Sequence, residues 1–234
     1  MKRHSLLFSL SLTLIALAIA TAPARAEVEV VAQLNNILTA ASSRCLDGPK
    51  PDPDLQKFWM PTPGSVDETL VSSMNSECGS AEGTGTLTID VERNMISGVY
   101  SASSSLAGPG GGGGATSACL KLVADEPLDW KLTAIASTVQ DGDPDVGALY
   151  LRFDGMDNDG DEDFDISWNG TLEPGEVYIL ILHASAARLS RADADGGCVT
   201  MDGSSERMVE FQLEFFDPET PNSSVSMGKL KSAF

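Results

Sequence analysis

Basic residues are scarce in this chain, and their scarcity excludes two classes of partner. The sequence has 15 Lys and Arg against 34 Asp and Glu, which gives a formal net charge of −19. A surface of this sign repels phosphate backbones, and no basic cluster occurs in the sequence, so we exclude nucleic-acid binding. Docking on an anionic lipid surface is disfavoured for the same reason. The composition instead favours solubility and attracts divalent cations.

Histidine is scarcer still, which removes most hydrolytic machinery. The chain has two histidines, and only His183 lies beyond the N-terminal segment. A Ser-His-Asp triad would have to use His183, but no Gly-x-Ser-x-Gly turn presents a serine and no His-Glu-x-x-His metal motif occurs. We expect His183 to lie at the end of a strand or to face a partner, and a catalytic role is the alternative.

Long apolar runs are absent apart from one at the N-terminus. Residues 6–20 are mainly apolar, follow a basic start, and precede Ala-Arg-Ala at residues 24–26, where a signal peptidase reads small side chains. The run is shorter than the roughly 20 residues of a spanning helix. We expect residues 1–26 to be a removed signal peptide, Glu27 to begin the mature chain, and the protein to be secreted or periplasmic without a transmembrane segment. A retained membrane anchor is the alternative.

Cysteine is limited to four residues, and none of them forms a Cys-x-x-Cys pair. A zinc knuckle or a thioredoxin-type redox site therefore has no support. An even number of cysteines in an exported chain predicts two disulfides, with three connectivities open. We favour pairing within the N-terminal part and pairing within the part that follows. The predicted disulfides are Cys45–Cys78 and Cys119–Cys198.

Residues 27–82 differ in pattern from the rest of the chain. Apolar residues between 30 and 41 recur at helical spacing, which predicts an opening helix. Residues 49–63 are rich in proline and predict an irregular connection. Residues 65–68 have the Ser-x-x-Glu form of a capping box, so a short helix is expected to follow through residues 70–74. We expect residues 27–82 to form a small helical or irregular appendage.

From residue 83 the apolar period changes from 3.6 to 2, which is typical of strands. Alternation in the first such segment points Leu87, Ile89 and Val91 inward. Short strands separated by Gly, Asp and Pro turns indicate a mainly β fold, an antiparallel β-sandwich of immunoglobulin-like or jelly-roll-like form, over residues 83–217. Residues 218–234 are expected to form a flexible tail. The alternating segments are residues 86–92, 96–100, 119–123, 130–137, 148–154, 164–168, 177–183 and 209–215.

The glycine-rich residues 108–114 invite comparison with a phosphate-binding loop. Such a loop requires Lys-Ser or Lys-Thr after its glycines, and neither occurs here. We therefore expect a flexible connection between strands at this place.

Residues 171–182 carry the most specific local pattern, Leu-x-Pro-Gly-x-x-Tyr leading into an alternating strand. This pattern resembles the tyrosine corner of fibronectin type III and related sandwiches. In those domains a tyrosine at the start of a strand bonds back to the backbone upstream and closes a crossover between sheets. The resemblance implies this role for Tyr178, and it implies no activity.

A broader resemblance covers residues 101–216. A Ser- and Ala-rich segment is followed by alternating strands, a Gly-x-Leu-x-Pro-Gly turn, a Ser- and Ala-rich loop and a Phe-rich last strand. This order is similar to the ectodomains of secreted bacterial proteins of the PEP-CTERM type and to pre-peptidase C-terminal domains. Both are extracellular β-sandwiches, mostly without known catalysis. The C-terminus lacks the Pro-Glu-Pro and hydrophobic helix of a sorting tail, so the resemblance implies a released protein.

The acidic residues 141–165 supply the sharpest functional candidate. The motif Asp-Asn-Asp-Gly-Asp-Glu-Asp at residues 157–163 resembles the calcium loops of integrin-like and thrombospondin-like repeats. Calcium takes about 6–8 oxygen ligands, and alternate Asp side chains around a glycine turn can converge on one ion. Both the EF-hand pattern and the shorter repeat pattern lack their first Asp here, and the alternative is a solvated acidic hairpin tip. The predicted calcium ligands are Asp157, Asp159 and Asp163, with Asp161 and Asp154 as further ligands.

Two functions remain open. The leading one is an exported, non-catalytic β-sandwich that binds an extracellular glycan or protein partner or builds a surface assembly, with calcium as its cofactor. The rival is a secreted carbohydrate-active hydrolase with paired carboxylates, which would need a concave, aromatic-lined groove with two carboxyls about 5–10 Å apart. Trp59, Trp130 and Trp168 are the aromatic candidates for stacking on sugars. Alternation, however, places Trp168 with Phe164 and Ile166 toward the core.

Overall fold

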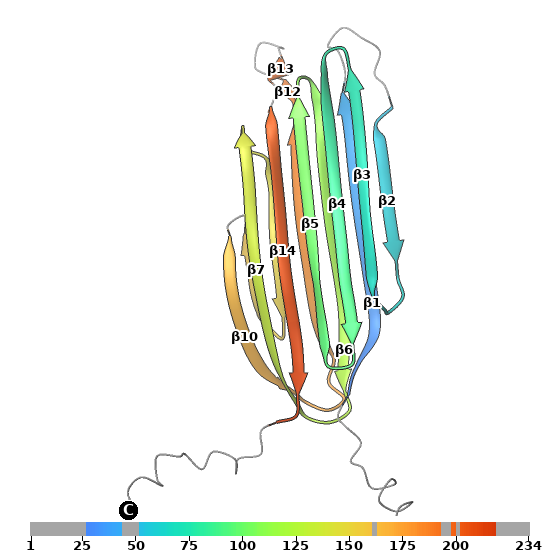
Figure 1. Cartoon of the computed structure of the whole chain (residues 1–234), viewed down its shortest axis with the longest axis vertical. Coiled ribbons are helices and arrows are strands. Elements are labelled where there is room, and N and C mark those ends of the chain that lie inside the picture. The colour runs from blue at the N-terminus through green and yellow to red at the C-terminus, as the bar shows by residue number, and fades with distance from the viewer. Residues whose placement is uncertain (1–26, 44–51, 161–162, 193–197, 200–201, 219–234) are drawn as a thin grey trace, which may run out of the picture.

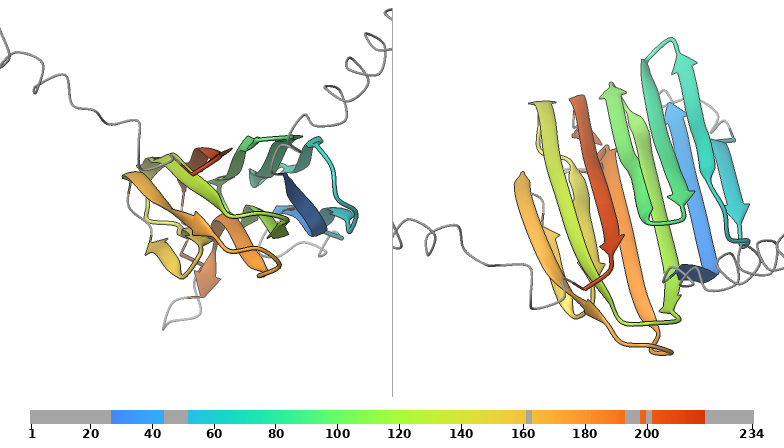
Figure 2. Two further views of the ribbon diagram at one scale, coloured as in Figure 1. Left: turned by 90° about the horizontal axis from the view of Figure 1, so that it is seen from below. Right: turned by 60° about the horizontal axis from the view of Figure 1, so that its bottom comes forward.

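The chain folds into two antiparallel sheets that pack face to face (Figure 1), and the two layers are seen from other directions in Figure 2. This computed structural model has no helix within the residues it describes. The predicted antiparallel β-sandwich is confirmed. The described residues are 27–43, 52–160, 163–192, 198–199 and 202–218.

Each sheet has six strands. The first has the order β2-β1-β6-β11-β8-β9, and the second, which faces the viewer in Figure 1, has the order β10-β7-β14-β5-β4-β3. The first sheet consists of β1 (Val28–Ser43), β2 (Asp54–Met60), β6 (Gly110–Ala124), β8 (Val146–Phe153), β9 (Met156–Gly160) and β11 (Tyr178–Leu189). The second consists of β3 (Val66–Ser76), β4 (Gly79–Glu92), β5 (Met95–Ala107), β7 (Leu128–Gly142), β10 (Phe164–Leu172) and β14 (Gly203–Phe216). A small separate pair joins β12 (Arg191–Ala192) to β13 (Cys198–Val199).

The core lies between the sheets and follows from alternation along the strands. Each of the eight predicted segments lies in a strand, apart from single residues at the ends of two of them. Leu87 and Ile89 are fully buried, and Val91 packs against the core, as predicted. Trp130 is fully buried and meets Phe153 edge-on, with ring centroids 4.8 Å apart.

The predicted helices in the N-terminal part are wrong. Residues 30–41 belong to β1, which lies between β2 and β6, and residues 70–74 belong to β3, which pairs with β4. The boundary predicted at residue 83 falls inside β4, so these strands belong to the two sheets. The cause is the composition of β1: Ile37 faces the core, while Leu34 and Leu38 face outward. Apolar residues on both faces of a strand imitate the spacing of a helix.

The predicted flexible glycine connection is also wrong, because Gly110–Gly114 open the central strand β6. At Gly114 a Cβ atom would overlap the carbonyl oxygen of Thr84 on the other sheet, and at Gly112 it would overlap that of Glu82. Conversely, a Cβ at Gly83 would overlap the backbone of Gly113. The two sheets therefore meet backbone to backbone at this end, which lies at the top of Figure 1. Only glycine permits such an approach.

Replacement of Gly114 by Ala tests this contact. The new methyl group cannot fit without moving one sheet, so the free energy of unfolding should fall by about 1–3 kcal/mol. Chemical denaturation of the variant and the parent protein measures this. The control is Ser117→Ala on the outward side of the same strand, which should change stability by less than about 0.5 kcal/mol. Equal stability of both variants would contradict the close approach of the sheets.

Candidate functional site

The hairpin of β8 and β9 carries most of the predicted calcium ligands. Its two-residue turn is Asp154-Gly155, and both residues have positive φ, 50° and 74°. Asp-Gly is the pair that a tight hairpin turn of this kind favours, so Asp154 has a structural reason to be there. Asp157 and Asp159 alternate along β9 and are both exposed. The hairpin therefore places these two carboxylates on one face.

The remaining predicted ligands do not join them within the described residues. The carboxylate of Asp163 accepts a hydrogen bond from the backbone N–H of Thr138 at 2.6 Å. Asp157 is paired across the strands with Arg152, and Asp161 lies outside the described residues. No group of three metal-binding side chains is found in the described part of the chain.

The tyrosine-corner contact is present. The hydroxyl oxygen of Tyr178 accepts a hydrogen bond from the backbone N–H of Glu173 at 2.7 Å. Glu173 follows β10 of the second sheet, and Tyr178 begins β11 of the first. The tyrosine thus fastens the crossover between the sheets.

One of the two predicted disulfides is absent. Cys119 is a free thiol, so its predicted bond to Cys198 is wrong. In the strand register of β12 and β13, Cys198 lies opposite Ala192, which is just beyond the Gly110 end of β6. Cys119 lies nine residues away from that end, along β6. That separation is about 30 Å, and disulfides need Cα atoms within about 7 Å.

The other predicted disulfide, Cys45–Cys78, stays a prediction. Cys78 is not a free thiol, and Cys45 lies outside the described residues. The neighbouring backbone is close: the hydroxyl of Ser43 lies 2.9 Å from that of Ser76 and donates to the carbonyl of Gly79 at 2.8 Å. The end of β1 and the β3–β4 turn therefore lie side by side.

His183 lies on the outward side of β11 and is half-buried. Loss of solvent lowers its pKa. In register it stands between Ser117 of β6 and Tyr150 of β8. Among the described residues no hydrogen bond joins His183 to a serine or a carboxylate. The pairing that a catalytic base requires is therefore missing from this part of the chain.

A shallow groove of about 480 Å³ lies on the outer side of the second sheet. Its lining includes the carboxylates of Asp90, Asp165 and Glu210. The one aromatic residue in the lining, Phe211, is 2% exposed and belongs to the core. The aromatic-lined groove that a hydrolase would need is not formed by these residues.

The tryptophans are distributed away from this groove. Trp130 is in the core, and Trp168 packs against the core with Phe164 and Ile166, as predicted. Trp59 is 54% exposed on the outer side of the first sheet. Only Trp59 is therefore open to a large partner.

The outer side of the first sheet is distinguished by its charge. No Asp or Glu occurs in β6, β8 or β11, and none occurs in β1 beyond Glu29. Lys57, Lys121 and Arg152 are exposed there. We call the outward side chains of β2, β1 from residue 32, β6, β11 and β8 the acid-free face. Its exposed apolar residues are Leu34, Leu38, Leu55, Trp59, Val146, Ile179 and Leu189.

Strand register organises this face into rows. One row crosses all six strands, because each of its members is the cross-strand partner of the next. It consists of Trp59, Asn36, Ser117, His183, Tyr150 and Asp159.

The outer side of the second sheet has the opposite character. It presents Ser and Thr side chains and exposed apolar residues such as Ile135 and Val139 between many carboxylates, with Lys131 exposed among them. The two faces of the sandwich therefore differ strongly in charge. The exposed carboxylates include Asp67, Asp90, Asp165, Glu206, Glu210 and Glu214.

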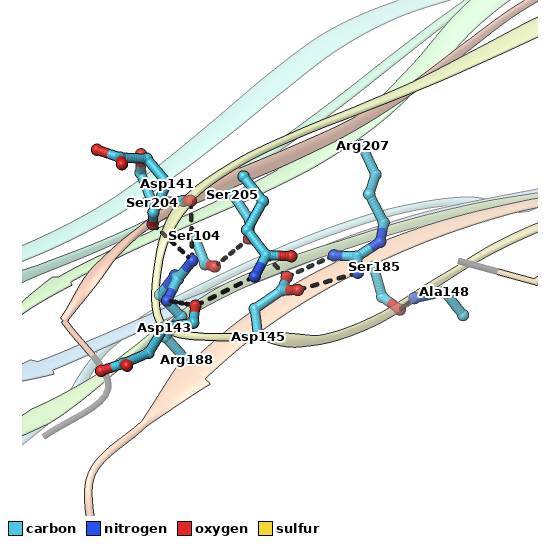
Figure 3. Close-up of polar contacts among 11 residues, drawn as sticks. Ser104, Asp141, Asp143, Asp145, Ala148, Ser185, Arg188, Ser204, Ser205 and Arg207 are labelled. Carbon is cyan, nitrogen blue, oxygen red and sulfur yellow. Dashed lines mark hydrogen bonds and ion pairs between the residues drawn. The ribbon is translucent and has the colours of Figure 1, made fainter. Parts of the chain in front are cut away.

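Two arginines are buried at the glycine-rich end, where Figure 3 shows their contacts. Arg188 of β11 is 0% exposed and donates to backbone carbonyl oxygens, including those of Asp141 at 3.0 Å and Ser204 at 2.9 Å. Arg207 of β14 pairs with Asp145 through two bonds, one of them 2.9 Å long, and their side chains are 3% and 1% exposed. Arg188 of the first sheet also donates to the carbonyl oxygen of Asp143, and Arg207 belongs to the second sheet, so the two arginines fasten the β7–β8 connection, residues 143–145, to both sheets.

Sequence reasoning missed this cluster, although a signal existed. Arg188 continues the inward series of Ala184 and Ala186, and Arg207 stands between the inward Ser205 and Val209. A base at an inward position needs a buried partner. Burial alone would raise the pKa of Asp145, but hydrogen bonds from Arg207 and Ser205 and the charges of both arginines hold the pKa below its usual value.

Comparisons with models of protein families, with curated proteins and with solved structures found no match to this chain. Within the described residues, no helix is able to cross a membrane. The function must therefore be inferred from the residues themselves.

Replacement of Asp145 by Asn should lower the free energy of unfolding at pH 7 by about 3–5 kcal/mol, because Arg207 is left as a buried, unpaired charge. A carboxyl with a depressed folded pKa stabilises the fold above its unfolded pKa, about 3.9, and loses this contribution as the pH falls through the folded value. The difference between parent and variant should therefore shrink below about pH 4.

Urea unfolding across this pH range measures the effect. The matched control is Glu206→Gln, next to Arg207 but exposed, which should change stability by less than about 0.5 kcal/mol. A difference that stays constant as the pH falls would show that the carboxylate charge does not stabilise the cluster.

Proposed function

We propose that this protein is an exported β-sandwich that works by association through its acid-free face and catalyses no reaction. The observation that carries the proposal is the contrast between this face and the rest of a chain with a net charge of −19. A broad surface that combines exposed apolar side chains with an absence of carboxylates is typical of an interaction site. Its partner is another protein chain or an extracellular glycan.

Aromatic side chains on the face support this use. Trp59 is 54% exposed, and the Nζ atom of Lys57 lies 5.4 Å from the centre of its ring. Tyr150 stands in the same row. Tryptophan and tyrosine dominate the binding energy of many protein interfaces and also stack on sugar rings.

The rival function, glycan hydrolysis, has weaker support. The carboxylates of Asp90, Asp165 and Glu210 line a groove, but no exposed aromatic side chain lines it with them. His183 has no hydrogen-bonded serine or carboxylate in the described part of the chain. Binding therefore accounts for more of the surface than hydrolysis does.

Calcium belongs to the proposal as a stabilising ion at the β9 end of the face. Asp157 and Asp159 share one side of β9, and Asp161 and Asp163 follow in the sequence. Without a cation these carboxylates repel one another. Coordination would replace that repulsion, and binding to the folded state alone raises its stability.

The experiment uses the exported protein, whose intact mass also shows whether it begins at Glu27. Association is measured for the protein alone, with a glycan panel and with an extracellular protein fraction, each in millimolar Ca²⁺, Mg²⁺ or chelator. The parent protein should associate with itself, with a glycan or with another protein. Leu38→Glu on the acid-free face should raise the dissociation constant of that complex at least about tenfold. Ile135→Glu, at an exposed site of the second sheet, should behave like the parent.

Other outcomes would overturn the proposal. One is that the parent protein associates with none of these partners. The other is that it releases sugar from a glycan and that Glu210→Gln or Asp165→Asn abolishes this release. For calcium, the melting temperature should rise more in Ca²⁺ than in Mg²⁺, and an equal rise would indicate general screening only.

A further inference from the structure

We propose that the partner on the acid-free face is a second copy of this chain, which forms a closed dimer with a twofold axis. The inference rests on the proposed function and names its partner. It follows from the size of the face, from the charge of the whole molecule, and from the charges on the two edge strands of the first sheet.

The size of the face suits a stable dimer. Four of its five strands, β1 from residue 32, β6, β11 and β8, average about 12 residues. At about 4.8 Å between strands and 3.3 Å per residue they give a footprint of about 19 Å by 40 Å. This is roughly 750 Å², close to the approximately 800 Å² per partner of a stable interface. Its exposed apolar residues are spread across the footprint and include Leu34, Leu38 and Ile179, which are 39–40% exposed.

The overall charge restricts how two copies can meet. Loss of Lys2, Arg3 and Arg25 with the predicted signal would take the net charge from −19 to −22. Copies that approached through the second sheet would bring rows of carboxylates together, for example Glu206 and Glu210. The acid-free face is the side on which two copies can meet without that repulsion.

The two edge strands of the first sheet carry opposite charges on their outer side. Lys57 projects from β2 at one edge of the first sheet, and Asp159 projects from β9 at the other. A twofold axis in the plane of the face, parallel to the strands and between β6 and β11, places β2 of each copy over β9 of the other. Trp59 then faces Asp159 of the second copy, because both belong to one row. Lys57, two residues along β2, lies about 7 Å along the strand from that position and can reach the carboxylate with its long side chain, twice by symmetry. The acidic faces remain outside and keep the dimer soluble.

Sedimentation of the full exported chain over a micromolar range tests the dimer, with chelator present so that calcium does not occupy Asp159. The parent protein should sediment as a dimer. Leu38→Glu and Leu34→Glu should each raise the dissociation constant at least about tenfold, while Ile135→Glu should not change it. Circular dichroism and a thermal melt confirm that each variant folds.

A charge exchange tests the orientation. Lys57→Glu and Asp159→Lys should each weaken the dimer, and the double variant should recover most of the loss, because the pair is restored with its signs reversed. A parent protein that is monomeric throughout, or an open polymer, would overturn the dimer. So would single variants without effect, or a double variant no better than either single one.

The failure of the dimer and the failure of the proposed function are distinguishable. If the parent is monomeric but Leu38→Glu loses a glycan or another protein, the face binds a different partner and the dimer is wrong. If neither the parent nor the variant associates with anything, both proposals are wrong.

Discussion

The direct contact between the two sheets at the glycine-rich end is the constraint on which the other features depend. Gly112 and Gly114 of β6 touch the backbone of β4 and β5, where a single methyl group would not fit. Side chains cannot fit between these glycines and the facing strands. Around this contact the buried residues are small ones such as Ser104 and Ser205, the small cluster of Ala41, Ala81 and Leu106, and the two arginines. The large apolar side chains, Trp130 and Phe153 among them, are buried toward the other end of the sandwich. The main apolar core therefore lies toward that end, and the glycine-rich end holds only a small apolar cluster.

The buried arginines are a consequence of this arrangement. With little apolar area to bury at the glycine-rich end, hydrophobic burial contributes little to holding the β7–β8 connection. Arg188 holds it by donating to the carbonyl oxygen of Asp143 in the connection and to those of Asp141 in β7 and Ser204 in β14, and Arg207 holds it through the carboxylate of Asp145. Such bonds are directional, so they fix the position of the connection and also stabilise it.

Separation of charge between the two outer sides is the feature that bears on function. A chain with this excess of carboxylates could have spread them over its whole surface. Instead β6, β8 and β11 lack them, while β14 alternates them with core residues at Glu206, Glu210 and Glu214. The carboxylates of the second sheet favour solubility, and the first sheet is the side that we propose for association.

The sequence predicted the elements in which one face is apolar and the other polar. The strands around Leu87 and Phe211 are of this kind, and the Tyr178 contact follows from a local motif. Prediction failed for β1, where Leu34 and Leu38 lie outside and Ile37 inside, and for the glycines of β6, whose strand pairing depends on neighbours distant in sequence. The acid-free face combines strands that are adjacent only in the folded sheet, so no local pattern revealed it.

Chemical modification of Cys119 tests most directly whether association covers the acid-free face. This free thiol lies on the face, in register between Leu34 and Ile181. The rate of its reaction with a maleimide, followed by peptide mass analysis, should fall as the protein concentration rises, because association covers it. In Leu38→Glu the rate should stay constant. A rate in the parent protein that does not depend on concentration, over a range in which the acid-free face is supposed to be covered, would contradict the account.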